Sequence, residues 1–128
     1  MRTLGLAAVS LGVLGLLLFW ALGDTVLLRT VDANGSSHET RLWVVDHRGA
    51  AWLRSAADHG WLQRLQANPE VELQRSDRWD ALRAVVSDSE NDREIINRLM
   101  AEKYGLAESL IGGVFDHSMP VVVKLEPR

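Results

Sequence analysis

An uninterrupted apolar segment at the N-terminus limits the possible folds of this chain more than any other feature. Between Leu4 and Leu22 the one polar side chain is Ser10, and no residue is charged. As a helix rising ~1.5 Å per residue, the segment would span about 28 Å, close to the hydrocarbon thickness of a bilayer. Trp20 lies near the outer end, where indoles favour the interface. The segment predicts a transmembrane anchor, residues 1–23, followed by one domain, residues 24–128.

A cleaved signal peptide is the alternative interpretation of this segment. Arg2 precedes the run, and small residues occur within Ala21–Gly23. The run is, however, longer than the apolar core of roughly 7–15 residues in signal peptides, and Phe19 and Trp20 crowd the cleavage site. We therefore expect a single-pass protein of the cell membrane whose partner is the lipid bilayer. Arg2 favours a cytoplasmic N-terminus and an extracytoplasmic domain, with a cytoplasmic domain as the alternative.

Composition and charge exclude several functions for the domain. The 14 Lys+Arg and 17 Asp+Glu residues are interspersed and leave a net charge of −3, so no basic stripe would bind nucleic acid. The absence of cysteine excludes disulfides and thiol catalysis. His47, His59 and His117 each follow an aspartate, but these pairs fall in predicted turns without metal-ligand spacing. We expect no metal site, and no residue is assigned as catalytic.

Short β-branched runs alternate with turn residues through most of the domain. Gly60–Ala67 instead has helical spacing, and a second helix begins with the capping and acidic residues 88–92. The pattern predicts an α+β domain, a barrel of about six antiparallel strands with two or three helices. The predicted strands are 25–31, 38–45, 50–54, 70–74, 79–86 and 119–125. The predicted helices are 60–67 and 88–104, and a short apolar piece, 106–115, precedes the last strand.

Two of the predicted strands each place an arginine beside a tryptophan. Residues two apart on a strand share a face, so Arg41 lies beside Trp43, and Trp52 lies beside Arg54. A cation next to an indole suits a planar anionic ligand, although tryptophans in a small domain more often fill the core, and we expect Trp43 and Trp52 to be structural. If Gly49 occupies a bulge, the two arginines face opposite ways; a two-residue loop at His47-Arg48 would place Arg41 opposite Arg54.

The chain from 26 to about 125 resembles a known superfamily in several runs, of which the helix-Asn-Pro-strand segment is the most specific. These runs are Leu27–Gly35, Arg41–Val45, Ala51–Ser55, Leu65–Leu73 and Lys103–Gly105. In them the chain resembles the split β-barrel flavin-binding superfamily. The nearest branch is the deazaflavin-dependent nitroreductases, and pyridoxamine 5′-phosphate oxidase-like proteins are cousins.

The resemblance implies that the ligand is FMN or a deazaflavin coenzyme, bound along the second and third strands. It places Arg41 at a phosphate-contacting position, and Arg54 and Ser55 at the end of the third strand, where phosphate contacts also occur. With the neighbouring Trp43 and Trp52, these residues form the predicted coenzyme site. The implied function is a membrane-anchored oxidoreductase that reduces a small-molecule substrate, and the implied assembly is a homodimer.

Two segments depart from the pattern of this family. Ser36–Glu39 replaces a basic loop rich in serine and glycine, and Asp58–Gly60 lacks the basic residue expected before the short helix. These departures favour the alternative function: a non-catalytic, membrane-anchored binding or scaffold domain that has lost the cofactor.

Overall fold

The computed structural model describes residues 24–111 and 120–128. The predicted membrane anchor therefore lies outside the described residues, and within them no helix has the length and apolar character needed to span a bilayer. In chain order, the elements are β1 (Thr25–Val31), β2 (Ser37–Trp43), β3 (Val45–His47), β4 (Ala50–Ser55), α2 (Gly60–Ala67), β5 (Glu70–Arg75), β6 (Arg78–Ser87), α3 (Glu90–Ile111) and β7 (Val121–Pro127).

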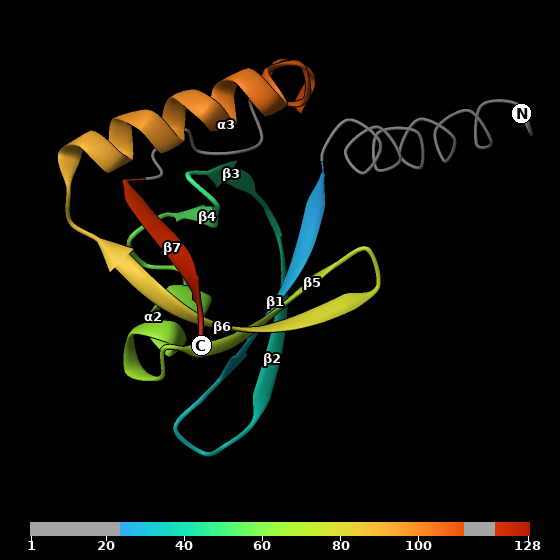
Figure 1. Ribbon diagram of the computed structural model, residues 1–128, viewed down its shortest axis with the longest axis vertical. Helices are drawn as coiled ribbons and strands as arrows, with labels where there is room; N and C mark the ends of the chain where they lie inside the picture. Colours follow the sequence, from blue (N-terminus) through green and yellow to red (C-terminus); the bar gives the residue numbers. More distant parts are fainter. Residues whose placement is uncertain (1–23, 112–119) are drawn as a thin grey trace, which may run out of the picture.

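The strands form one antiparallel sheet in the order β2-β1-β5-β6-β7-β4-β3. The two strands at the ends of this order, β2 and β3, are consecutive in the chain and separated only by Val44. The sheet therefore curves round until its two ends meet at this residue (Figure 1). Together with α2 and α3, it forms a split β-barrel of the α+β class, as the sequence predicts.

The predicted strand 38–45 is wrong in one respect, because the structure divides it into two strands. β2 pairs with β1 as far as Trp43, whereas β3 pairs with β4 from Val45 onward. The chain changes its pairing partner at Val44, whose side chain is fully buried. Seven strands are thus described where six were predicted.

The β3–β4 hairpin also differs from both predicted registers. Val45 pairs with Trp52 and His47 with Ala50, which leaves Arg48 and Gly49 as a two-residue turn. Both turn residues have positive φ, 52° and 77°, as the tight turns that match strand twist require. Neither the bulge at Gly49 nor a loop at His47-Arg48 occurs, and His47 belongs to β3 rather than to a turn.

The interior of the barrel holds the larger hydrophobic core. Alternate residues of β1 point inward, and one face of α2 closes the barrel with Trp61, Leu62 and Leu65. Each aliphatic side chain buried in this way contributes roughly 1.5–3 kcal/mol relative to an exposed one. This core also includes Val26, Leu28, Val44, Leu53, Val71, Leu73, Ala84, Val123 and Leu125.

A second core lies outside the barrel, where α3 crosses β3, β4 and β7 (Figure 1). Ile96, Met100 and Tyr104 recur every four residues and so share one face of α3. They pack on the outer side chains of the sheet, including Trp52 and Val122. The predicted end of this helix at Gly105 is wrong, because α3 continues to Ile111. A glycine within a helix costs only about 1 kcal/mol, which is too little to end one anchored this firmly.

Candidate functional site

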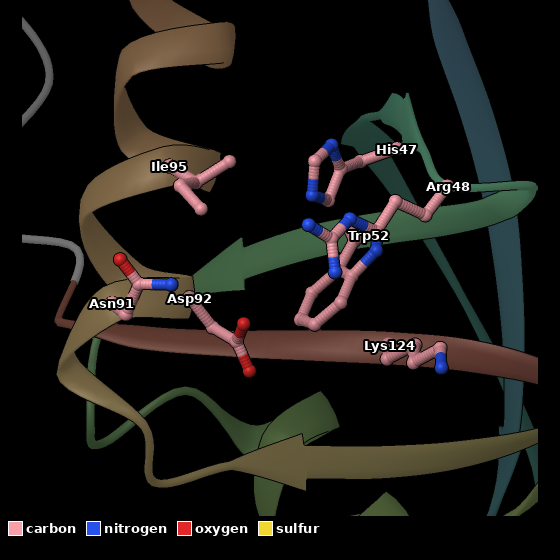
Figure 2. Close-up of a pocket in the computed structure, with 7 residues that line it drawn as sticks. All are labelled: His47, Arg48, Trp52, Asn91, Asp92, Ile95 and Lys124. Atoms are coloured by element: carbon pink, nitrogen blue, oxygen red, sulfur yellow. The ribbon is translucent and has the colours of Figure 1, made fainter.

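A pocket of about 190 Å³ opens between the β3–β4 hairpin and the first turns of α3. Figure 2 shows its lining side chains gathered from both sides of the gap between the hairpin and the helix. The lining carries two cations, one carboxylate, an imidazole and an indole, so it is polar with an aromatic wall. The residues are His47, Arg48, Trp52, Asn91, Asp92, Ile95 and Lys124.

Arg48 lines this pocket and has an unfavourable backbone conformation. Its φ of 52° lies in the left-handed region, where a side chain other than that of glycine, asparagine or aspartate costs roughly 1–2 kcal/mol. Gly49 follows at φ 77°. Within residues 24–111 and 120–128, the exposed Arg48 side chain makes no ion pair and no hydrogen bond. Its unusual backbone conformation and its unpaired guanidinium beside the pocket make it a candidate ligand-binding residue.

Trp52 forms the wall of the pocket and belongs to the outer core. Its side chain faces α3, only 6% of its surface is exposed, and its ring centroid lies 6.5 Å from that of His47. The indole nitrogen Nε1 is buried and has no hydrogen-bond partner among the described residues. Buried donors are nearly always paired in proteins, so this N–H is available to an acceptor that enters beside it.

The single carboxylate of the pocket is already engaged in capping α3. Asp92 Oδ2 accepts a hydrogen bond of 2.6 Å from the Ser87 hydroxyl, and its backbone N–H donates to Ser89 Oγ at 3.3 Å. Lys124, on β7, lies 3.3 Å from Glu126, which is an exposed pair of small energetic value. The lining of the pocket therefore carries two cations and one carboxylate.

The structure separates the five residues predicted to bind the coenzyme. Trp52 lines the pocket, and Arg54 lies on the same face of β4, its Nη1 3.5 Å from Asn97 Oδ1 of α3. Arg41 is exposed on β2 and donates to Thr25 Oγ1 at 3.3 Å. The remaining two are Trp43, which is stacked beneath α3, and Ser55, which is fully buried with its hydroxyl donating to Ala56 O at 2.6 Å.

The sequence marks none of the five polar residues of the pocket as ligand-binding: His47, Arg48, Asn91, Asp92 and Lys124. Its pattern predicts His47 to be a solvated turn residue. Lys124 reaches the hairpin only through the pairing of β4 with β7, in which it lies opposite Trp52. The unusual turn chemistry of Arg48-Gly49 was the one available signal, since asparagine or aspartate is preferred before the glycine.

A second polar cluster fixes the bend between β2 and β3. The Tyr104 hydroxyl accepts a hydrogen bond from Val44 N at 3.0 Å and lies 2.8 Å from Val44 O. Lys103 Nζ donates to the same carbonyl at 2.7 Å and to Asp24 Oδ2 at 3.0 Å. Burial raises the pKa of Tyr104, so its hydroxyl stays protonated as a donor. These bonds satisfy the backbone groups that Val44 cannot pair within the sheet.

An ion-pair network extends from this cluster to the hairpin. Arg75 donates to both carboxylate oxygens of Asp46, at 2.8 and 3.0 Å, and its guanidinium lies 3.7 Å from Asp24. The Arg75 hydrogen bonds hold the pKa of Asp46 below its usual value. Because Asp46 directly precedes His47 on β3, the network positions the strand that leads into the pocket.

The β1–β2 loop has its charges satisfied internally. Asp32 Oδ1 accepts from the backbone N–H groups of Asn34 and Ser36, and Oδ2 lies 2.8 Å from His38 Nε2. Hydrogen bonding to His38 and to these amides lowers the pKa of Asp32. Glu39 accepts from Arg29 at 2.9 Å. This loop therefore offers a ligand no unpaired cation.

Comparison with known proteins identifies related families and folds. Residues 12–126 match the family model described as F420H(2)-dependent quinone reductase. The solved structure of an F420-H2 dependent reductase, FDR-A, is 23% identical in sequence to this chain. The alignment covers 80% of this chain and 94% of the reductase chain, with a TM-score of 0.63. No curated protein of known function matches the sequence significantly.

Two further solved structures extend the comparison. One, described as a domain-swapped dimer, is 22% identical, covers 80% of each chain and has a TM-score of 0.63. A Listeria innocua protein assigned as a pyridoxamine 5′-phosphate oxidase is 15% identical, covers 88% of this chain and 90% of its own, and has a TM-score of 0.58. At these identities the structures show a shared fold. With the family match, they confirm the resemblance to the split β-barrel superfamily and its deazaflavin branch.

Proposed function

The chain belongs to the F420H(2)-dependent quinone reductase family, and on that premise we propose that it is an oxidoreductase that uses the deazaflavin coenzyme F420. The family match carries this proposal, because it covers nearly the whole chain, including every described element up to β7. FMN, which the fold also accommodates, is the second candidate coenzyme.

The outer face of β4 offers groups that fit such a coenzyme. A deazaflavin coenzyme joins a flat ring system to a phosphate and a carboxylate-bearing tail, so it requires an aromatic or apolar wall and cations. Trp52 and Arg54 share this face, and Arg48 and Lys124 border it. The donor set therefore fits the coenzyme chemically. The pocket of about 190 Å³ holds one group of the coenzyme, because whole ligands of that size occupy roughly 300–1,000 Å³.

Arg41, Trp43, Trp52, Arg54 and Ser55 remain the proposed coenzyme residues, with different support for each. Trp52 and Arg54 have the strongest support, because both side chains lie on the outer face of β4, which also borders the pocket. Arg41 lies at an exposed position from which a guanidinium could bind phosphate in a forked geometry. Trp43 and Ser55 would act from beneath, by supporting the strands that carry the other three.

When bound, the reduced coenzyme would supply a hydride to an acceptor such as a quinone, which would also take up a proton to become the quinol. The protein contributes position and electrostatics. Trp52 supplies an immobile wall because it is packed in the outer core, and the cations of the hairpin and β4 bind anionic groups. The Lys103–Tyr104 cluster and the Asp46–Arg75 pair keep β3 in place.

We propose that the apolar segment Leu4–Leu22 anchors the protein in the cell membrane. A lipophilic electron acceptor dissolved in the bilayer would suit a reductase anchored there. The charge-free run of membrane-spanning length supports this proposal. The proposed orientation places the domain outside, as Arg2 favours. Full-length protein should remain in membranes washed with alkaline carbonate. Release of a shortened protein beginning near Asp24 would show instead that the segment is a cleaved signal.

A homodimer is part of the proposal, supported by the related fold described as a domain-swapped dimer. The alternative function, a non-catalytic binding or scaffold domain, has one specific observation in its favour. The β1–β2 loop is acidic, and its charges are bound to one another.

Titration of the full-length protein in detergent with coenzyme F420, and separately with FMN, tests the proposed function by binding alone. Quenching of coenzyme fluorescence should saturate, and Arg54→Ala should weaken binding about tenfold, since a charge-assisted hydrogen bond contributes ~1.5–3 kcal/mol. Arg98→Ala, an exposed position on α3, serves as the control. If neither coenzyme saturates up to millimolar concentration, the scaffold function is the better account.

A further inference from the structure

We propose that the pocket between the β3–β4 hairpin and α3 is an oxyanion site whose principal ligand-binding residue is Arg48. The anion we assign to it is the phosphate or a tail carboxylate of the deazaflavin coenzyme, and this assignment rests on the function proposed above. The site lies away from Arg41 and the β1–β2 loop. It therefore gives the coenzyme tail a position that the sequence did not indicate.

The conformation of Arg48 is the first observation that supports this site. The two-residue turn would be more stable with asparagine or glycine at this position, because φ is 52°. The arginine side chain is exposed, is directed over the pocket in Figure 2, and makes no hydrogen bond or ion pair with the described residues. Non-glycine residues with positive φ cluster at functional sites.

The distribution of charge is the second observation. Arg29 and Arg75 are held by two acidic partners each, and Lys103 is bound to Asp24 and to the Val44 carbonyl. Arg48, in contrast, is exposed and makes no ion pair within the described residues. Lys124, which is paired with Glu126, adds a second cation, and the one acid in the pocket, Asp92, is bonded to Ser87. An entering anion would supply the missing partner.

The donors around the pocket match an oxyanion in number and size. The guanidinium offers several N–H groups in a fixed fork, which suits phosphate and carboxylate oxygens. The imidazole of His47 and the amide of Asn91 face the same space (Figure 2). The buried and unpaired Nε1 of Trp52 adds a donor in the wall. A volume of about 190 Å³ holds one such group with its neighbouring atoms.

The test compares the complete coenzyme with the deazaflavin riboside fragment, which lacks the phosphate and the glutamate tail. Both are titrated by fluorescence against wild type and Arg48→Asn, a variant that removes the cation but accepts the left-handed turn. The proposal predicts about tenfold weaker binding of the coenzyme by Arg48→Asn and unchanged binding of the fragment. Arg48→Lys should recover part of the loss, because it restores the charge without the planar fork.

Arg83→Ala is the matched control, because Arg83 is an exposed arginine on β6 that does not line the pocket. It should change the affinity for neither ligand. Unchanged coenzyme binding by Arg48→Asn would overturn the proposed site while leaving the proposed function intact.

If the wild-type protein binds neither the coenzyme nor the fragment, the proposed function fails, and inorganic phosphate then decides the site. A saturable change in tryptophan fluorescence that Arg48→Asn abolishes would support an oxyanion site filled by free phosphate. The absence of saturation in the wild type would overturn the site as well.

Discussion

The rings of Trp43 and Tyr104 lie face to face, with centroids 4.4 Å apart and planes inclined by 3°. The stack joins the last residue of β2 to the face of α3 that packs on the sheet. At its edge, the Tyr104 hydroxyl bonds to both backbone groups of Val44. One tyrosine therefore holds α3 against the point at which the barrel closes.

Tyr104→Phe tests the contribution of the hydroxyl while keeping the stacked ring. The variant leaves the N–H of Val44 buried and without its acceptor, which costs about 1–3 kcal/mol. Thermal unfolding should therefore begin at a lower temperature than in the wild type. A melting curve that coincides with that of the wild type would show that water satisfies the N–H of Val44 without the tyrosine.

Trp52→Ala should be strongly destabilising. Because Trp52 is packed in the outer core, its truncation should cost about 3–5 kcal/mol, measured as the free energy of unfolding in urea. Val85→Ala, on the exposed part of β6, should change it by less than about 1 kcal/mol. Equal stabilities of the two variants would contradict the placement of Trp52 in the core.

The Asp46–Arg75 pair should make stability depend on pH in the acid range. Because the pKa of Asp46 is lowered in the folded state, the unfolded state binds more protons as the pH falls. The contribution is complete above the unfolded pKa of about 3.9 and is lost as the pH falls through the lower, folded value. Asp46→Asn should thus be less stable than wild type near neutral pH, and the difference should shrink toward about pH 3.

Urea midpoints measured at several pH values check this expectation. Glu94→Gln, which removes an exposed carboxylate on α3, is the control and should show no such convergence. A difference between Asp46→Asn and wild type that stays constant from neutral to acid pH would contradict the ion pair.

The strain at Arg48 predicts a conflict between stability and binding. Arg48→Asn should raise the free energy of unfolding by about 0.5–1 kcal/mol, because asparagine suits the first position of this turn. The same substitution should weaken coenzyme binding. Urea unfolding of the two proteins without ligand provides the measurement, and a less stable variant would show that Arg48 serves the fold.

Local patterns in the sequence predicted most of the strands and both described helices. Alternating side chains marked β1 and β5, and helical spacing marked α2. The division at Val44 was not predictable, because the apolar pattern continues through the bend while only the pairing partner changes. Lys103 and Tyr104 anchor α3 just before Gly105 through contacts with distant residues, which the local sequence pattern does not show.

The candidate site was less predictable than the fold. The sequence selected Trp52 and Arg54 through their spacing on one strand, and the structure places both on the outer face of β4. It could not select Lys124, which lies far away in the chain and meets Trp52 through the β4–β7 register. The role of Arg48 depends on the length of the hairpin turn, and both predicted registers differed from the observed one.

The proposed reductase function can be measured as oxidation of the reduced coenzyme by a quinone. The full-length protein is mixed with reduced F420 and a soluble naphthoquinone, and the return of coenzyme fluorescence is followed over time. The account predicts oxidation that is proportional to protein concentration and slower in Arg54→Ala than in Arg98→Ala. A rate equal to that of the mixture without protein, under conditions in which the coenzyme is bound, would contradict a deazaflavin-dependent reductase.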